Sequence, residues 1–270
     1  MLGKIIKHEF KATYKVYLLL FISLFTITAL NKTTEYVPLD NTIWNIIKMF
    51  LFVAWIILLM FMVMGAMLLA VVRFYKTMVK DEGYLTHTLP VKKSQLIIGK
   101  FITSLIWMIV SFIMLIISIF LAYMSTGFMH DIINIMNEFA NLLSENPEII
   151  IHIVLVLIML ISSCGASIFQ FYASISLGQM FSGHKLAGSV LFYFVINYAI
   201  SILSTITMFI VPDFVGRMND TAGLSTYDMM TQEGIVFDEL MIMMIIWQII
   251  CMAVCYFITN YRFSKKLNLE

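Results

Sequence analysis

The sequence is poor in charge. Asp, Glu, Lys and Arg make up only 12% of its 270 residues, whereas an ordinary soluble domain carries about 25%. Hydrophobic residues make up 61%, and a water-soluble fold would have to expose much of that excess. Disordered chains are poor in apolar residues and rich in charge, so disorder is excluded as well. The composition predicts a membrane-embedded protein and argues against a soluble enzyme.

Neither the cysteines nor the net charge points to a function. The three cysteines, Cys164, Cys251 and Cys255, all lie in apolar runs, and an odd number gives no disulfide framework. Cys251 and Cys255 are spaced to face one side of a helix. A structural metal site wants four ligands, however, and neither His nor a carboxylate stands beside them, so we expect no metal. The net charge of +1 gives no nucleic-acid signature, and we expect no nucleic-acid partner.

Six stretches contain no Asp, Glu, Lys or Arg and approach or exceed the roughly 20 residues that a membrane helix needs. We therefore expect an all-α polytopic membrane protein, with residues 1–270 forming a single transmembrane domain. The predicted spans cover about 16–31, 49–72, 101–124, 149–177, 187–211 and 240–260. A signal peptide is the alternative for the first run. That run begins late and no A-x-A cleavage site follows it, so an uncleaved span is expected.

Lys and Arg lie mostly on one side of these spans. Of the 17 Lys and Arg residues, all but three lie on the same side of the membrane as both termini. The exceptions are Lys32, Lys48 and Arg217. Because cations are retained on the cytoplasmic side, we expect both termini in the cytoplasm. Four cations, Lys4, Lys7, Lys11 and Lys15, share one face of a predicted helix at 1–15, opposite an apolar face. This pattern favours an interfacial helix on the bilayer, and a plain cationic flank explains it equally well.

The longest cytoplasmic segment, 73–100, combines charge with an apolar patch. Pro90 ends any helix in it, and Ser94 is expected to cap the helix that enters the third span. A short, partly apolar helix held off the bilayer needs a partner to cover it. A solvated loop and a hydrolytic site are the alternatives. The residues concerned are Asp81, Glu82, Gly83, Tyr84, Leu85, His87 and Leu89.

On the outer side, residues 131–145 alternate polar and apolar side chains at helical spacing, which predicts a second interfacial helix. The outer segment 212–239 carries apolar islands and is predicted to pack at the membrane exit as re-entrant helices. Polar side chains inside the spans are sparse, and form stripes that fit either helix packing or a substrate path. The candidate residues for a substrate path or for helix packing include two methionines of the second span and polar residues of the fifth. They are Met60, Met64, Tyr193, Asn197, Ser201 and Ser204.

An energy source is absent. No Asp, Glu, Lys or Arg lies inside a predicted span, which counts against an ion-coupled carrier. His152, near the outer end of the fourth span, has no convincing partner in the sequence. The nearest approach to a Walker A loop, 178–186, inserts His184 between the second glycine and the lysine and ends on Leu186. We therefore expect a chain that is not itself an enzyme and binds no cofactor. If it pumps a solute, a separate ATPase must supply the work.

Three patches resemble the permease subunits of bacterial ABC-2-type exporters. They are RFYK at 73–76, DEGYLTHTLP at 81–90 and SQL at 94–96; SISLGQ at 174–179 and HKLAG at 184–188; and GKIIKHEFK at 3–11. The resemblance covers essentially the whole six-span chain, and the patch at 81–90 is its most specific part.

The resemblance implies a bacterial cytoplasmic-membrane location, two ABC ATPase subunits that hold ATP and Mg²⁺, and a second permease, identical or related. Residues near 80–90 match the coupling helix, the N-terminal helix matches an interfacial elbow, and 212–239 match exit helices. Some small members resemble exporters of amphipathic peptides, including toxins and antimicrobial peptides. The alternative is a membrane sensor or immunity protein with no translocating role.

Overall fold

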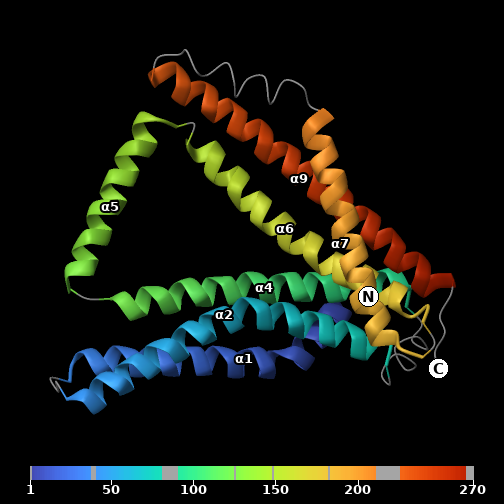
Figure 1. Ribbon diagram of the computed structural model, residues 1–270, viewed down its shortest axis with the longest axis horizontal. Coiled ribbons are helices and arrows are strands. Elements are labelled where there is room, and N and C mark those ends of the chain that lie inside the picture. The colour runs from blue at the N-terminus through green and yellow to red at the C-terminus, as the bar shows by residue number, and fades with distance from the viewer. Residues whose placement is uncertain are drawn as a thin grey trace. The chain divides into compact units, whose positions relative to one another are not determined.

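The computed structural model describes residues 2–37, 41–80, 91–124, 126–147, 149–181, 183–210 and 226–265. Within these ranges the chain forms seven α-helices and no β-strand (Figure 1). The helices are α1 (Leu2–Glu35), α2 (Thr42–Met78), α4 (Lys93–Tyr123), α5 (Thr126–Glu145), α6 (Ile149–Gly178), α7 (Lys185–Ile210) and α9 (Thr226–Lys265).

Six of these helices are long and apolar enough to cross a membrane, which confirms the prediction of an all-α polytopic membrane protein. The candidate spans are Leu2–Thr34, Thr42–Met78, Lys93–Tyr123, Ile149–Gly178, Lys185–Thr207 and Asp238–Ser264. The remaining helix, α5, is the one predicted at 131–145, and it begins five residues earlier. The protein is therefore a multi-pass membrane protein.

The helices extend beyond the charge-free runs on which the predicted spans were based. A single helix, α1, covers both the predicted interfacial segment 1–15 and the first span. The segment 73–100 is shorter as a loop than expected, because α2 continues to Met78 and α4 begins at Lys93. The last helix begins at Thr226, inside the predicted outer segment 212–239. Absence of charge marks the part of a helix that crosses hydrocarbon, whereas charged residues readily continue that helix into water.

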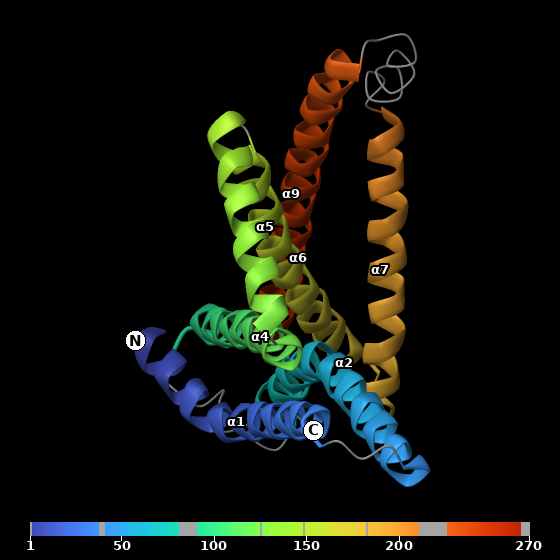
Figure 2. The same cartoon turned by 90° about the vertical axis from the view of Figure 1, so that its left-hand side faces the viewer.

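The chain divides into two compact units. Unit 1 comprises Met1–Lys76 and Leu89–Glu145, and unit 2 comprises Thr77–Thr88 and Asn146–Glu270. In unit 1 the helices α1, α2 and α4 lie together (Figures 1 and 2). Thr28 pairs with Ser118, and four residues later Lys32 reaches the carbonyl of Ala122, so α1 and α4 run parallel.

The core of unit 1 is apolar with a small polar centre. Leu24, Trp55 and Met62 are buried together. Among them the Thr28 hydroxyl lies 2.8 Å from the Ser118 hydroxyl, and the Trp55 indole N–H donates to Ser118 over 3.2 Å. In lipid the hydrophobic effect does not drive helices together, so packing and such interhelical hydrogen bonds set their register.

Much of the remaining apolar surface is exposed. Leu19 and Phe50 have exposed fractions of 67% and 72%. Side chains of this kind, spread over membrane-spanning helices, are solvated by lipid chains and not by water. The exposure that would make a soluble protein aggregate is therefore expected for a polytopic membrane protein.

Unit 2 is built on α6, which packs against both α7 and α9. The helices α6 and α9 run parallel, since Ser162 bonds to Gln248 and Phe169 meets Tyr256 with ring centroids 5.7 Å apart. The helix α7 runs antiparallel to α6. At its start it approaches α6 so closely that a Cβ added at Gly178 would lie 2.2 Å from the hydroxyl of Ser189.

Candidate functional site

The residues predicted to contact an ATPase, Asp81, Glu82, Gly83, Tyr84, Leu85, His87 and Leu89, lie outside the described residues. The structure does describe the helices on either side of them. Lys92, and not Ser94, occupies the N-cap of α4, and no side chain caps this helix end. The expectation for Ser94 was therefore wrong: this residue lies within the first helical turn.

A cluster of three charged residues lies near these helix ends, in unit 1. Glu9 of α1 accepts a hydrogen bond from the Arg73 Nε of α2 over 3.2 Å. The same carboxylate binds the ammonium group of Lys100 of α4. Glu9 is 7% exposed and Lys100 is 4% exposed, so the bond between them is shielded from water. One carboxylate thus joins three helices, and the set is called the Glu9 cluster below.

The position of Glu9 follows from the amphipathic pattern of α1. Lys4, Lys7, Lys11 and Lys15 are all exposed. Glu9 lies on the opposite face, which is the face that packs against the other helices. Sequence reasoning missed this residue. The available signal was a carboxylate in the middle of the apolar face of a helix, since a charge there requires a partner.

The contact between α1 and α4 continues from the Glu9 cluster toward the membrane. The Trp107 indole N–H donates to the Thr13 hydroxyl over 2.9 Å. The Tyr17 ring stacks on Trp107 with centroids 4.3 Å apart, and its hydroxyl donates to the carbonyl of Ala66 on α2. The N-terminal half of α1 is therefore packed against α2 and α4 by hydrogen bonds and aromatic contacts.

The electrostatics of the Glu9 cluster favour a structural joint. Two adjacent cations stabilise the ionised form of Glu9, and a carboxylate held in this way is a poor proton acceptor. Burying charges costs free energy, which pairing and hydrogen bonding offset; removing one partner of a buried pair is strongly destabilising. The arrangement suits the transmission of position between helices better than acid–base chemistry.

The residues predicted for a substrate path or helix packing fall into two groups. Met60 and Met64 of α2 are highly exposed, at 67% and 68%. On α7, Asn197 and Ser201 are exposed, whereas Tyr193 and Ser204 are half-buried. Tyr193 stacks on Phe171 of α6 at 4.3 Å, and Ser204 donates to the carbonyl of Ser201. Tyr193 therefore serves helix packing, and the polar face of Asn197 and Ser201 lies beside that contact.

Two further polar contacts join α6 to α9. The ring of His152 is paired with the carboxylate of Asp238, and Ser162 donates to the side-chain oxygen of Gln248. His152 and Asp238 are separated by 86 positions in the sequence, and no local sequence pattern connects them. Only the parallel packing of the two helices brings these side chains together.

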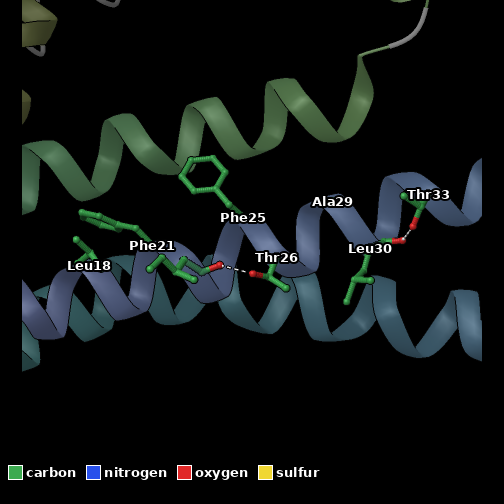
Figure 3. Close-up of a pocket in the computed structure, with 8 residues that line it drawn as sticks. Leu18, Phe21, Phe25, Thr26, Ala29, Leu30 and Thr33 are labelled. Carbon is green, nitrogen blue, oxygen red and sulfur yellow. Dashed lines mark hydrogen bonds between the residues drawn. The ribbon is translucent and has the colours of Figure 1, made fainter.

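A groove of about 560 Å³ lies along α1, on the part of the helix that crosses the membrane. Phe25 projects toward the neighbouring helix (Figure 3). Two hydroxyls in the groove are satisfied by their own helix, Thr26 on Ile22 and Thr33 on Leu30 (Figure 3). The lining is thus almost wholly apolar and lacks the polar groups that orient a specific ligand. It consists of Leu18, Phe21, Ile22, Phe25, Thr26, Ala29, Leu30 and Thr33.

Within the described part of the chain, no group of three or more His, Cys, Asp or Glu side chains could hold a metal ion. The two cysteines of α9, Cys251 and Cys255, are buried thiols. Comparison with known protein families, with curated proteins and with solved structures finds no match for this chain.

Proposed function

We propose that the chain is the permease subunit of a bacterial ABC-2-type exporter that moves hydrophobic or amphipathic peptides out of the cell. It is not itself catalytic; two copies of a separate ABC ATPase bind ATP and Mg²⁺. The observation that carries the proposal is the exposed polar face of α7, formed by Asn197 and Ser201.

Asn197 stands at the middle of α7, which runs from Lys185 to Ile210. An amide side chain facing hydrocarbon at mid-membrane is costly, because lipid offers it no hydrogen-bond partner. Contact with another protein helix or with water in a path removes that cost. Ser201, one turn further along the same face, is also exposed. Both observations support the proposal that this face of α7 contacts a second permease or the substrate, and not lipid.

The remaining features support a passive subunit driven from the cytoplasm. The six charge-free runs predicted to cross the membrane contain no Asp, Glu, Lys or Arg that could bind a coupling ion, and the sequence has no phosphate-binding loop. Placing the cation-rich helix ends in the cytoplasm brings both termini and the segment 79–92 to that side. In this proposal the basic N-terminal helix contacts anionic headgroups, and the outer helix α5 lies at the opposite interface.

The proposed mechanism begins with closure of the ATPase pair on binding ATP. The movement passes through Tyr84, Leu85 and Leu89 to α2 and α4, which bear the two ends of the segment. The paired permeases close toward the cytoplasm and open outward, releasing the peptide. The exposed methionines Met60 and Met64 provide a deformable apolar surface suited to varied side chains.

Water accessibility tests the proposed path at α7. In a chain with its three cysteines replaced by alanine, we expect Asn197→Cys to react about tenfold faster than Val195→Cys with a charged thiol reagent, because thiols react as thiolates in water. Val195 is a matched control because it is 52% exposed on an apolar flank of the same helix. Rates would be measured in vesicles with reagent added to each side. Equally slow modification of both positions would place Asn197 in a dry environment and remove the main support for a path.

A further inference from the structure

The Glu9 cluster is attached to both ends of the segment that carries the proposed ATPase contact. Arg73 lies five residues before the end of α2 at Met78. Lys100 lies seven residues after the start of α4 at Lys93. Glu9 belongs to neither helix and bonds to both. A movement of the segment between α2 and α4 therefore acts directly on the two partners of Glu9.

We propose that Glu9 is a positioning residue that makes α1 move together with the two ends of segment 79–92. The inference rests on the proposed function for the force that acts on this segment. Without Glu9, α1 keeps only its apolar and hydrogen-bonded contacts with α2 and α4, so it follows a displacement of their ends less closely. With it, α1, α2 and α4 move as one body, and the displacement reaches the membrane-spanning part of all three.

The contacts on either side of Glu9 make α1 rigid enough for this role. One turn before it, α1 meets α4 so closely that a Cβ at Gly99 would lie 2.8 Å from Cγ2 of Ile5. One turn after it, Trp107 bonds to Thr13, and Tyr17 then stacks on the same indole. Such close contact transmits displacement, because packed protein interiors are nearly incompressible. Glu9 adds to this seam a carboxylate that links α1 to both flanking helices through charge.

The shared carboxylate gives an unequal pattern of mutational effects. Glu9→Gln keeps the shape of the side chain and removes both ion pairs, leaving Arg73 and Lys100 beside each other with one fewer counter-charge. Lys100→Met removes one ion pair and leaves the pair of Glu9 with Arg73. Combining the two substitutions relieves the repulsion between the cations. Glu9→Gln is therefore expected to be the most harmful of the three, and the added Lys100→Met to restore part of the loss.

The first arm of the test uses the purified chain alone in lipid nanodiscs. Hydrogen exchange of residues 2–17 reports the local opening of α1. We expect Glu9→Gln to accelerate this exchange by about tenfold, the double variant to bring it back toward the wild-type rate, and Lys100→Met to have the smallest effect. His8→Gln is the matched control, because His8 precedes Glu9 and is exposed. Unchanged exchange in Glu9→Gln would overturn the proposal.

The second arm uses the complex of the chain with its ATPase and an amphipathic peptide. We expect Glu9→Gln to bind the ATPase as the wild type does and to lose about tenfold in the ratio of peptide-stimulated to basal ATP hydrolysis. The double variant should regain part of that ratio. Normal stimulation in Glu9→Gln, despite faster exchange at 2–17, would show a stabilising contact without a role in coupling and would overturn the proposal.

The two arms separate failure of this inference from failure of the proposed function. If the wild-type chain binds no ATPase, the permease assignment falls, and the coupling role of Glu9 falls with it. The exchange experiment still shows whether Glu9 joins α1 to α2 and α4. If the wild-type complex forms and responds to peptide, only the comparison among Glu9→Gln, Lys100→Met and the double variant decides the role of Glu9.

Discussion

Replacing Gly178 with alanine is expected to prevent α6 and α7 from packing and to reduce sharply the yield of folded protein. An added Cβ would lie 2.2 Å from the Ser189 hydroxyl, 2.5 Å from its backbone nitrogen and 2.6 Å from its Cα. Two of these atoms belong to the backbone, so the contact cannot be relieved by a side-chain rotation. Overpacking of this kind typically costs about 1–3 kcal/mol of unfolding free energy, and a contact with fixed backbone atoms falls at the upper end of that range.

The measurement is the thermal unfolding midpoint of the detergent-purified protein, followed by fluorescence and size exclusion. Gly183→Ala is the matched control, because nothing lies within 4 Å of the Cβ that it would add. The conformation of Gly178 gives no separate reason for glycine, since its φ is not positive. A Gly178→Ala protein as stable as Gly183→Ala would show that α7 does not approach α6 in this way.

The double substitution Tyr84→Ala and Leu89→Ala is expected to abolish stable association with the partner ATPase. The proposal assigns the apolar contact to these two side chains, and buried aromatic and aliphatic anchors carry most of the energy of a typical interface. Losing two of them costs on the order of 4 kcal/mol, which is close to a thousandfold in affinity. Membrane insertion should be unaffected, because both residues lie outside the six charge-free runs that the sequence predicts to cross the membrane.

The measurement is recovery of the ATPase when the tagged chain is purified from membranes. Lys92→Ala serves as a control, because Lys92 occupies the N-cap of α4 and lies outside the apolar patch. Normal recovery of the complex together with normal transport in the Tyr84→Ala and Leu89→Ala variant would contradict the proposal that segment 79–92 contacts the ATPase.

The number of membrane-spanning helices was predictable because hydrocarbon imposes a length and an absence of charge on each. The exposed face of Lys4, Lys7, Lys11 and Lys15 was predictable for a similar reason, since helical periodicity decides which residues share a face. The helix ends were not, because a helix continues through charged residues such as Arg73 and Lys93, where low hydropathy does not say whether the chain is helical.

The sequence did not predict which polar side chains of different helices pair with one another. Glu9 appeared as an isolated acid among cations, and His152 appeared to have no partner. Both find their partners through contacts between helices far apart in the chain, 91 positions for Glu9 with Lys100 and 86 for His152 with Asp238. Periodicity predicts which face of a helix is buried but not which residue of another helix will meet it.

The central claim, that the chain is a permease driven by a separate ATPase, is tested most directly by transport. Inside-out vesicles containing the chain and the ATPase proposed as its partner would be supplied with a fluorescent amphipathic peptide and ATP. The account predicts accumulation of peptide inside the vesicles that requires ATP and the wild-type chain, and that is lost in the Tyr84→Ala and Leu89→Ala variant. Vesicles that accumulate no peptide, with an intact chain that binds no ATPase, would contradict the account and favour a membrane sensor or immunity protein.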